Sequence, residues 1–178
     1  ATAKARDVKS VGVLGSGLMG AGIAPAHARR GVPAVMVDVG QDRLADGLQR
    51  ACQVIEGRIK IGRATPLDMQ QMLTRLSTST SRAVFSDADV IVEAITENEA
   101  LKTQAYGELK SLLRDDAILC SNTSTISITR MAEAAPHPER FVGMHFFYPV
   151  DRMELVEVIR GAKTDYETVA TIVALAKR

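Results

Sequence analysis

Glycines at positions 15, 17 and 20 form a G-x-G-x-x-G motif that directly follows a short apolar run. If the run is a strand and a helix follows the motif, each glycine has its own task. Gly15 permits the tight turn, Gly17 lets a pyrophosphate approach the backbone, and Gly20 lets the helix pack closely on the strand. The N–H groups and positive dipole end of the helix would face the phosphates. The motif therefore indicates a dinucleotide site, which would also include Leu18 and Met19.

An acidic residue, Asp38, ends the second apolar run, residues 34–38. A dinucleotide site needs a carboxylate at about this distance from the glycines, where it binds the adenine ribose hydroxyls. An acid there favours NAD, because the 2′-phosphate of NADP would meet a like charge. The alternative interpretation is that the glycines only form a turn and Asp38 caps the next helix. The combined context favours the NAD site.

His145 and Glu157 offer a pair suited to proton transfer. His145 ends a predicted strand, at the edge where parallel sheets bind their ligands. Glu157 has two apolar residues on each side, and a buried carboxylate needs a partner. If Glu157 accepts a hydrogen bond from one imidazole nitrogen, the other nitrogen can remove an alcohol proton near neutral pH. The alternative places Glu157 on a solvated edge strand and makes His145 structural; their spacing does not separate the two.

Alternating short apolar runs and helical periodicities must position these residues. The pattern predicts a Rossmann-like, doubly wound α/β fold with a mostly parallel sheet and an inserted helical pair after the second strand. Residues 78–81 are short and polar, which favours a loop. Strands are expected at residues 10–14, 34–38, 88–94, 117–121, 141–145 and 155–159, and helices at 16–30, 41–61, from 65 onward, 97–113, 127–134 and 166–177.

Composition narrows the function classes. The 178 residues are 46% hydrophobic, and we expect one domain, residues 1–178. A net charge of +1 gives no support to nucleic-acid binding. The two cysteines, Cys52 and Cys120, belong to no metal-binding pattern, so we expect no metal and a reducing, cytoplasmic compartment. We also expect no membrane span, because no run is long and apolar enough.

Several long strings resemble the 3-hydroxyacyl-CoA dehydrogenase family, from about residue 7 to residue 176. Within the family, residues 31–33 and 124–126 look most like the α-subunit of the multifunctional fatty-acid oxidation complex. The strings that carry the resemblance are residues 95–98 with Lys102, 121–126, 143–147, 149–150 and 155–159.

The resemblance implies a role for each matching residue. His145 would be the general base, Glu157 its orienting carboxylate, and Ser124 a hydrogen-bond partner of the substrate oxygen. Asn122 would lie alongside at the nicotinamide end of the site. Residues that would border the cofactor and the substrate entrance are Glu97 and Lys102, and candidates for the CoA phosphates are Arg58, Lys60 and Arg63, unless those three form a solvated basic face.

The function implied is NAD-dependent oxidation of (S)-3-hydroxyacyl-CoA to 3-ketoacyl-CoA in fatty-acid β-oxidation. Two alternatives are the NAD-binding module of another hydroxy-acid dehydrogenase and a non-enzymatic NAD-binding or structural domain. In relatives of this kind an enoyl-CoA hydratase region precedes the domain, a C-terminal helical domain follows it, and a thiolase subunit is a partner. We therefore expect the chain to be the cofactor-binding part of a longer protein, weakly active or inactive by itself.

Two positions depart from the family pattern. Tyr148 stands where relatives have Asn before Pro149, which bears on substrate positioning. Pro25 lies inside the first predicted helix, where it should kink or locally unwind the helix.

Overall fold

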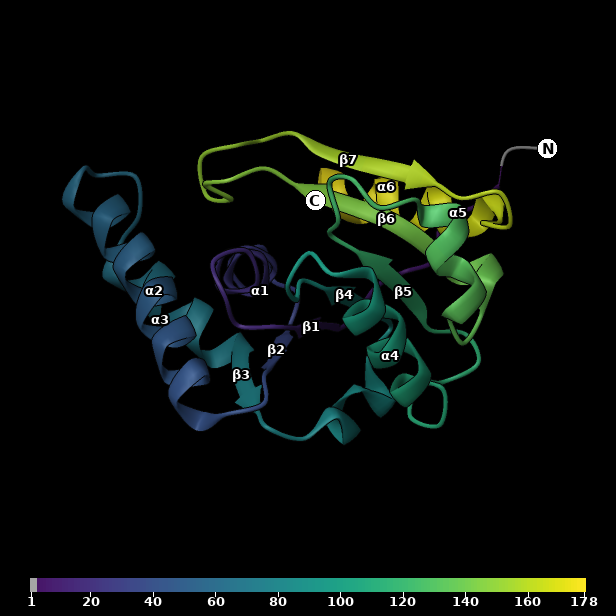
Figure 1. Ribbon diagram of the computed structural model, residues 1–178. Helices are drawn as coiled ribbons and strands as arrows, with labels where there is room; N and C mark the ends of the chain where they lie inside the picture. Colours follow the sequence, from purple (N-terminus) through teal and green to yellow (C-terminus); the bar gives the residue numbers. More distant parts are fainter. Residues whose placement is uncertain (1–2) are drawn as a thin grey trace.

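The computed structural model describes residues 3–178, which form a seven-stranded sheet with helices on both faces (Figure 1). The strand order is β3-β2-β1-β4-β5-β6-β7, and all neighbouring pairs are parallel except β6 with β7. This order reverses direction between β1 and β4, which is where doubly wound sheets bind ligands. The strands are β1 (Val11–Leu14), β2 (Ala34–Val37), β3 (Leu76–Ser79), β4 (Val90–Glu93), β5 (Ile118–Ser121), β6 (Phe141–Phe146) and β7 (Val156–Arg160).

The helices are assigned to faces by the two hydrophobic cores that they share with the sheet. On one face α1, α2, α3 and α6 pack against alternate residues of the central strands, such as Val13 and Val92. On the other face α4, α5 and Phe85 pack against the intervening residues, such as Ile91. The helices are α1 (Gly20–Arg29), α2 (Gln41–Lys60), α3 (Pro66–Arg75), α4 (Glu99–Leu109), α5 (Ile128–Met131) and α6 (Tyr166–Lys177), with 3₁₀ turns at Arg82–Asp87, Ala132–Ala134 and Pro138–Arg140.

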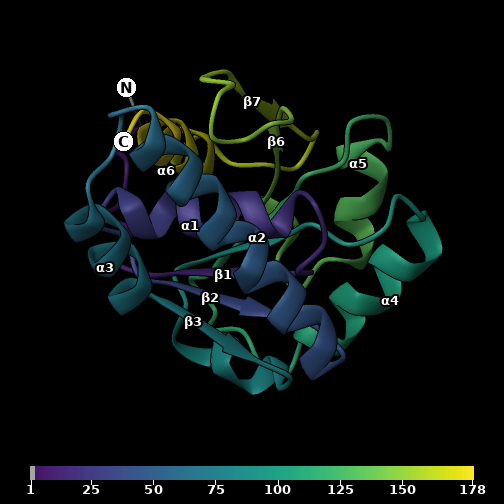
Figure 2. The same cartoon turned by 90° about the vertical axis from the view of Figure 1, so that its left-hand side faces the viewer.

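The predicted helical pair after the second strand is formed by α2 and α3. Figure 2 shows both helices on the outer side of α1. A capping box starts α3: the Thr65 side chain accepts from the Asp68 N–H, and the Asp68 carboxylate accepts from the Thr65 N–H. Pro66 follows the cap at the first helical position, where its missing N–H has no cost. These local signals explain why a second helix begins so soon after the first one ends.

The structure corrects three local expectations. Residues 76–79, partly assigned to a loop, form β3, because pairing with β2 supplies hydrogen bonds that a polar segment can use at a sheet edge. The helix after the glycine motif begins at Gly20 rather than at residue 16. Pro25 lies within α1 and is buried there, and the helix continues through it without unwinding, so of the two expected effects only a kink stays a prediction. No helix of the described chain is long and apolar enough to cross a membrane.

Candidate functional site

The glycine loop connects β1 to α1 as the motif requires. Gly15 has a φ of +108°, which residues with a side chain rarely adopt. A Cβ on Gly20 would lie 1.9 Å from the carbonyl oxygen of Gly15, so a side chain there would push the helix off the strand. A Cβ on Gly17 would meet no atom within 4 Å, which leaves room for a ligand against the backbone. No side chain caps α1 and its first turn holds no acid, so its dipole is available to an anion. This cradle fits a pyrophosphate.

Asp38 lies beside the glycine loop, directly after β2. Its Oδ2 accepts hydrogen bonds from the N–H and the hydroxyl of Ser16, each at 2.8 Å. Partial burial alone would raise the pKa of Asp38, but bonds from Ser16 and Val39 bring it below the ordinary value. The carboxylate is therefore ionised at neutral pH and fixed to the loop. That position suits the predicted contact with ribose hydroxyls, which stays a prediction.

A buried carboxylate, Glu93, organises the ends of β4 and β5. Its Oε1 accepts from the Lys102 ammonium at 2.6 Å and from the Ile95 N–H at 2.9 Å. Its Oε2 accepts from the hydroxyls of Tyr106 and Ser121, each at 2.7 Å. Burial, and next the Glu93 charge, raise the pKa of Tyr106, so this hydroxyl stays a donor. Four donors, two from α4, one from β5 and one from the loop after β4, thus satisfy one carboxylate beneath the site.

Lys102 is buried rather than exposed at an open entrance. Its side chain is 1% exposed and lies inside this cluster, 3.4 Å from Glu97, and its expected place beside the cofactor stays a prediction. The reason is α4, which turns Lys102 inward one turn after the helix begins, toward the carboxylate at the end of β4. A buried ammonium needs such a partner.

Glu97 connects the segment after β4 to the segment after β5. Its Oε1 accepts from the Thr123 hydroxyl and, at 3.2 Å each, from the Ser124 N–H and the Thr125 hydroxyl. Its Oε2 lies 3.4 Å from the Lys102 Nζ. Partial burial alone would raise the pKa of Glu97, but the Thr123 hydrogen bond and the Lys102 charge lower it. Glu97 is half exposed, so it can hold the Ser124 loop and still face a ligand.

Asn122 joins β5 to β6 at the same edge. Its N–H donates to the Glu93 carbonyl at 2.9 Å, and its side-chain oxygen accepts from the Phe146 N–H at 2.9 Å. Phe146 follows His145 in the chain, so Asn122 fixes the backbone next to the predicted base. Ser124 follows two residues later, with its side chain exposed.

His145 and Glu157 form the predicted pair. The Nδ1 of His145 lies 2.8 Å from the Glu157 Oε2, and the two residues are directly opposite in the antiparallel β6–β7 pair. The His145 ring also packs on Phe147, with centroids 4.6 Å apart. Among the described residues, nothing hydrogen-bonds the other imidazole nitrogen. Of the two placements that the sequence left open for Glu157, the structure has the edge strand: β7 lies at the sheet edge and the carboxylate is half exposed. The His145–Glu157 pair and the edge position of β7 were alternatives in the sequence analysis, and in the structure they occur together.

A cavity of about 780 Å³ lies between α1, α2 and the segment after β6. Leu18 of the glycine loop and Tyr148 are part of its wall, which connects the cavity to both halves of the predicted site. Arg58 donates to the Asp151 carbonyl at 3.1 Å, while its Nε is buried without a partner among the described residues. The basic side chains that line the cavity are Arg29, Arg50, Arg58, Arg63 and Arg152.

Two functional features escaped sequence reasoning. Glu93 ends an apolar run, and an acid in such a run is the signal that singled out Glu157; applied to residues 90–93 it would have found the buried carboxylate. Of the five cavity arginines, only Arg58 and Arg63 were candidates. No local sequence pattern marks Arg29, Arg50 and Arg152 as neighbours, because they come from three separate segments that only the fold brings together. The predicted Lys60 is not among the residues lining the cavity.

The described residues hold no cluster of His, Cys, Asp and Glu suited to a metal ion. A glycine loop that fits a pyrophosphate, a carboxylate fixed beside it and a histidine paired with a carboxylate, all at one edge of the sheet, are features of a dinucleotide-dependent dehydrogenase domain.

Comparison with known proteins identifies the family. Residues 10–178 match the family described as 3-hydroxyacyl-CoA dehydrogenase, NAD binding domain, and the chain belongs to this family of NAD-dependent oxidoreductases. It is 45% identical over 175 residues to the fatty acid oxidation complex subunit alpha of Psychrobacter cryohalolentis, covering 98% of this chain and 24% of that protein. The subunit alpha of Pseudomonas putida is 46% identical over 174 residues with the same coverage. The chain thus spans about a quarter of the length of these relatives.

Solved structures agree with this family and with the fold. The (S)-3-hydroxybutyryl-CoA dehydrogenase of Ralstonia eutropha superposes with a TM-score of 0.94 at 38% identity, over 96% of this chain and 60% of that one. The 3-hydroxybutyryl-CoA dehydrogenase of Escherichia coli gives a TM-score of 0.93 at 33% identity, over 97% of this chain and 36% of that one. The predicted fold class and the predicted cofactor, NAD, are confirmed.

Proposed function

We propose that the protein containing this chain oxidises (S)-3-hydroxyacyl-CoA to 3-ketoacyl-CoA, and that residues 10–178 bind NAD and supply the base. The observation that carries the proposal is the 2.8 Å contact between His145 Nδ1 and Glu157. When Nδ1–H donates to the carboxylate, Nε2 is the unprotonated nitrogen that can accept a proton. Bound NAD supplies the hydride acceptor for the carbon that carries the hydroxyl.

His145 would take the proton of the 3-hydroxyl as the hydride departs. The imidazolium formed is stabilised by Glu157, whose carboxylate lies opposite it across the β6–β7 pair. The half-exposed position of Glu157 leaves a path from the imidazole to water for the return of the proton. Ser124 would hydrogen-bond the substrate oxygen from the neighbouring loop, and Asn122 would hold the base's strand and border the nicotinamide.

NAD would lie along the glycine loop, with its pyrophosphate over Gly15, Gly17 and Gly20 and its adenine ribose on Asp38. Leu18, Met19 and Glu97 would complete its surroundings. The acidic group of Asp38 would favour NAD over NADP, because the 2′-phosphate of NADP would meet a like charge. These contacts are supported by the open space at Gly17 and by the uncapped amino end of α1.

The CoA moiety would enter through the arginine-lined cavity. Phosphates are bound by guanidinium groups with geometric preference, and Arg58 offers a buried Nε without a protein partner. Leu18 on the wall links this cavity to the cofactor loop. We assign Arg58 a CoA phosphate contact, with Arg50 and Arg63 as neighbours.

The similarity to subunit alpha of fatty acid oxidation complexes bears on the whole protein. We propose a multidomain, cytoplasmic protein in which this chain is the NAD-binding domain. An enoyl-CoA hydratase region, a helical domain that closes the cleft and a thiolase subunit would be its neighbours.

The test follows oxidation of NADH by the protein at its full natural length, with acetoacetyl-CoA as substrate, beside a fluorescence titration of NADH. Turnover with the thioester and none with free acetoacetate would support the proposal. Equal turnover with the free acid would favour another hydroxy-acid dehydrogenase. NADH binding without turnover of either substrate would leave a non-enzymatic NAD-binding domain and contradict the proposed reaction.

A further inference from the structure

Ser16 lies between the first two glycines of the dinucleotide loop and is buried, with 3% of the residue exposed. Its N–H and its hydroxyl each donate to Asp38 Oδ2 at 2.8 Å. The hydroxyl oxygen also lies 3.0 Å from the carbonyl oxygen of Arg43, in the first turn of α2. One small side chain therefore connects three parts of the cofactor site: the glycine loop, the end of β2 and the start of α2.

We propose that Ser16 is a positioning residue, whose hydroxyl holds the Asp38 carboxylate in the orientation that accepts the adenine ribose of NAD and disfavours the 2′-phosphate of NADP. The inference rests on the proposed function, because the ribose contact of Asp38 is part of that proposal. It gives a second residue a part in cofactor selection, through Asp38 and without a contact of its own with the cofactor.

The Asp38 side chain has few other groups to hold it. Its second oxygen, Oδ1, accepts from the Val39 N–H at 2.7 Å, but Val39 is the next residue in the chain and moves with Asp38. Among the described residues, the hydrogen bonds that reach this carboxylate from another segment are the two from Ser16. The N–H fixes one direction and the hydroxyl adds a second, which restricts rotation of the side chain between its staggered conformers. Oδ1, with one protein donor, can still accept from a ligand.

Helix α2 packs directly against Ser16, because the helix carries a glycine opposite it. A Cβ on Gly47 would lie 2.9 Å from the Ser16 carbonyl oxygen and 3.0 Å from the Ser16 Cβ. The Arg43 carbonyl, one helical turn before Gly47, reaches the hydroxyl from the same side. The hydroxyl has one hydrogen for two acceptors, and an ionised carboxylate is the stronger acceptor of the two. Ser16 is thus a rigid donor for Asp38.

The role that follows for the Ser16 hydroxyl concerns orientation and not ionisation. Partial burial alone would raise the pKa of Asp38, but the bonds from Ser16, the Val39 N–H and the charge on Arg43 bring it below the ordinary value. Without the hydroxyl the pKa would move back toward its usual range near about 4, so the group would still be ionised at neutral pH. The charge would remain, but the carboxylate would turn away from the ribose for part of the time.

The experiment compares Ser16→Ala with Ser10→Ala in the protein at its full natural length. Ser10 precedes the other end of β1, where its hydroxyl donates to the Asp87 carbonyl at 3.2 Å. We expect the Kd of NADH to rise about threefold to tenfold for Ser16→Ala, because a hydrogen bond to a charged group is lost. The Kd of NADPH should not rise, because the 2′-phosphate meets a less firmly placed charge. Ser10→Ala should change neither Kd by more than about twofold.

The ratio of the two Kd values separates positioning from a structural role. NADH and NADPH present the same pyrophosphate to the glycine loop, so a loop that is merely loosened would bind both more weakly by the same factor. An equal rise of both Kd values, or an unchanged Kd of NADH, would overturn the proposal. Ser16→Gly also lacks the hydroxyl and adds no atom opposite Gly47, so it should change the ratio in the same direction and serves if Ser16→Ala does not fold.

A double-mutant cycle tests whether Ser16 acts through Asp38. In the Asp38→Ala background the hydroxyl has no carboxylate to hold, so adding Ser16→Ala should change the Kd of NADH by less than about twofold. A further threefold loss would show a direct contact with the cofactor or a general effect on the loop, and would contradict the proposal.

These titrations need no acyl substrate, which separates this inference from the proposed reaction. A lowered preference for NADH in Ser16→Ala, in a protein that turns over no acyl-CoA, would contradict the proposed reaction alone. Equal weakening of NADH and NADPH, in a protein that oxidises NADH with acetoacetyl-CoA, would contradict the positioning role alone.

Discussion

The two ends of strand β4 carry similar charges in opposite surroundings. At the amino end, Asp89 accepts from the Lys9 and Ser10 N–H groups at 2.7 and 3.2 Å and from Arg114 at 2.8 Å. At the carboxyl end, four residues later, Glu93 is paired with Lys102 at 2.6 Å. The Arg114 side chain is 39% exposed, whereas that of Lys102 is 1% exposed. Burial, not charge, distinguishes the two pairs.

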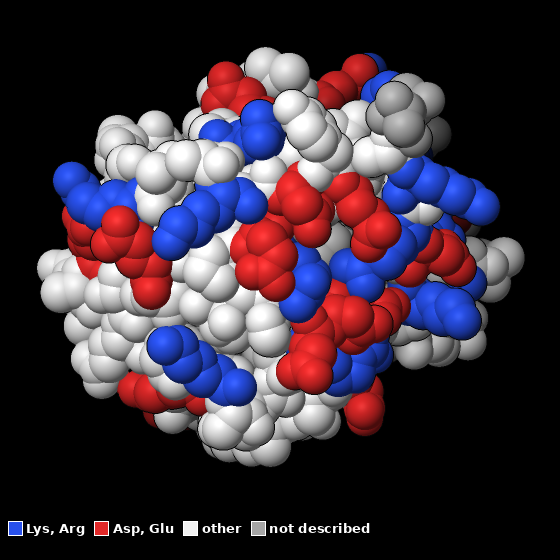
Figure 3. Space-filling model, turned by 90° about the vertical axis from the view of Figure 1, so that its right-hand side faces the viewer, with Lys and Arg blue, Asp and Glu red and all other residues white. Residues whose placement is uncertain are grey.

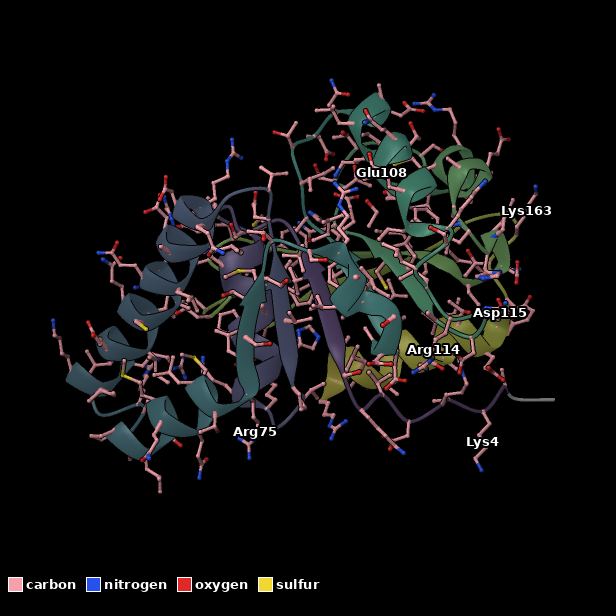
Figure 4. All side chains as sticks on the ribbon, turned by 90° about the horizontal axis from the view of Figure 1, so that it is seen from below. Lys4, Arg75, Glu108, Arg114, Asp115 and Lys163 are labelled. Atoms are coloured by element: carbon pink, nitrogen blue, oxygen red, sulfur yellow. The ribbon has the colours of Figure 1, made fainter. Side chains whose placement is uncertain are left out.

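The amino end belongs to a surface of mixed charge. Figure 3 shows acidic and basic side chains interleaved on the right-hand face of the molecule, without a large area of either sign. Figure 4 labels Arg114 well apart from Glu108 on α4. Arg114 also pairs with Asp116 at 2.9 Å, and Asp116 lies 3.6 Å from Arg6. Such solvated pairs contribute little each, while loss of one partner of a buried pair leaves an uncompensated charge. The amino end thus connects segments at the surface, whereas the carboxyl end holds a buried charge pair beneath the predicted site.

Replacement of His145 should give the largest effect, because it removes the base at the carboxyl edge. We expect His145→Gln to lower kcat about 10²- to 10⁴-fold, with the Kd of NADH within a few-fold of its original value. The measurement is steady-state NADH oxidation with acetoacetyl-CoA, beside a fluorescence titration. His137→Gln, in the turn before β6, is the matched control and should retain activity. Full activity of His145→Gln would contradict the assignment of the base.

Replacement of Asp38 tests the proposed contact with the adenine ribose of NAD. Asp38→Ala removes hydrogen bonds to a charged acceptor, so the Kd of NADH should rise about ten- to a hundredfold and discrimination against NADPH should relax. Titrations with both cofactors measure this. Asp42→Ala, an exposed acid in the first turn of α2, controls for the loss of charge. Tight NADPH binding by the unmodified protein would remove the ribose role from Asp38.

Arg58 tests the cavity that would receive CoA. Arg58→Met keeps much of the side-chain volume and removes the guanidinium, so KM for acetoacetyl-CoA should rise about threefold to fivefold at unchanged kcat. The rise should shrink at high salt, because screening weakens the contact with phosphate. Lys60→Met, two residues later and outside the cavity lining, is the control. Equal effects of the two variants would indicate a general surface charge in place of a phosphate contact.

Substitution of Arg114, at the amino end of β4, should give the smallest effect, and this effect should be on stability alone. Arg114→Met should lower the midpoint of thermal unfolding by a few degrees and leave kcat unchanged, because the pairs it breaks are solvated. Calorimetry and the same kinetic assay measure the two quantities. A tenfold loss of kcat would show that this end of β4 also positions the site and would remove the contrast between the ends.

The contribution of the Asp89–Arg114 pair to stability should depend on pH. Partial burial alone would raise the pKa of Asp89, but bonds from Arg114 and Lys9 lower it overall. A carboxylate whose pKa is lower folded than unfolded stabilises the protein above about pH 4 and loses this contribution as the pH falls further. The unfolding midpoint of Asp89→Asn should therefore lie below that of the unmodified protein at pH 7 and converge with it below pH 4. A difference between the two unfolding midpoints that does not change with pH would contradict the lowered pKa of Asp89.

Local sequence patterns were sufficient to predict most of the strands and helices of this protein and the turn between β1 and α1. The glycine spacing predicted the turn between β1 and α1, and apolar runs predicted six of the seven strands. The predicted bounds of α6, residues 166–177, are those observed. These features depend on periodicity, on glycine conformation and on residues that are neighbours in sequence, and all of these are visible in the chain itself.

Burial could not be predicted in the same way. Glu93 and Glu157 both lie in apolar runs, yet Glu93 is fully buried and Glu157 is half exposed. The difference arises from strand order, since β4 is central and β7 is an edge, and no local pattern specifies that order. Likewise the polar segment that forms β3 becomes a strand through its pairing with β2.

By itself, the sequence determined the alternation of strands and helices, the dinucleotide loop and the candidate residues His145, Asp38 and Ser124. Only the tertiary structure decided which charges lie inside. It placed the Lys102 ammonium inside a buried cluster with Glu93, and it gathered five arginines from three segments around one cavity. The physical reason is that the cost of a charge depends on its surroundings in space, which the packed sheet alone defines.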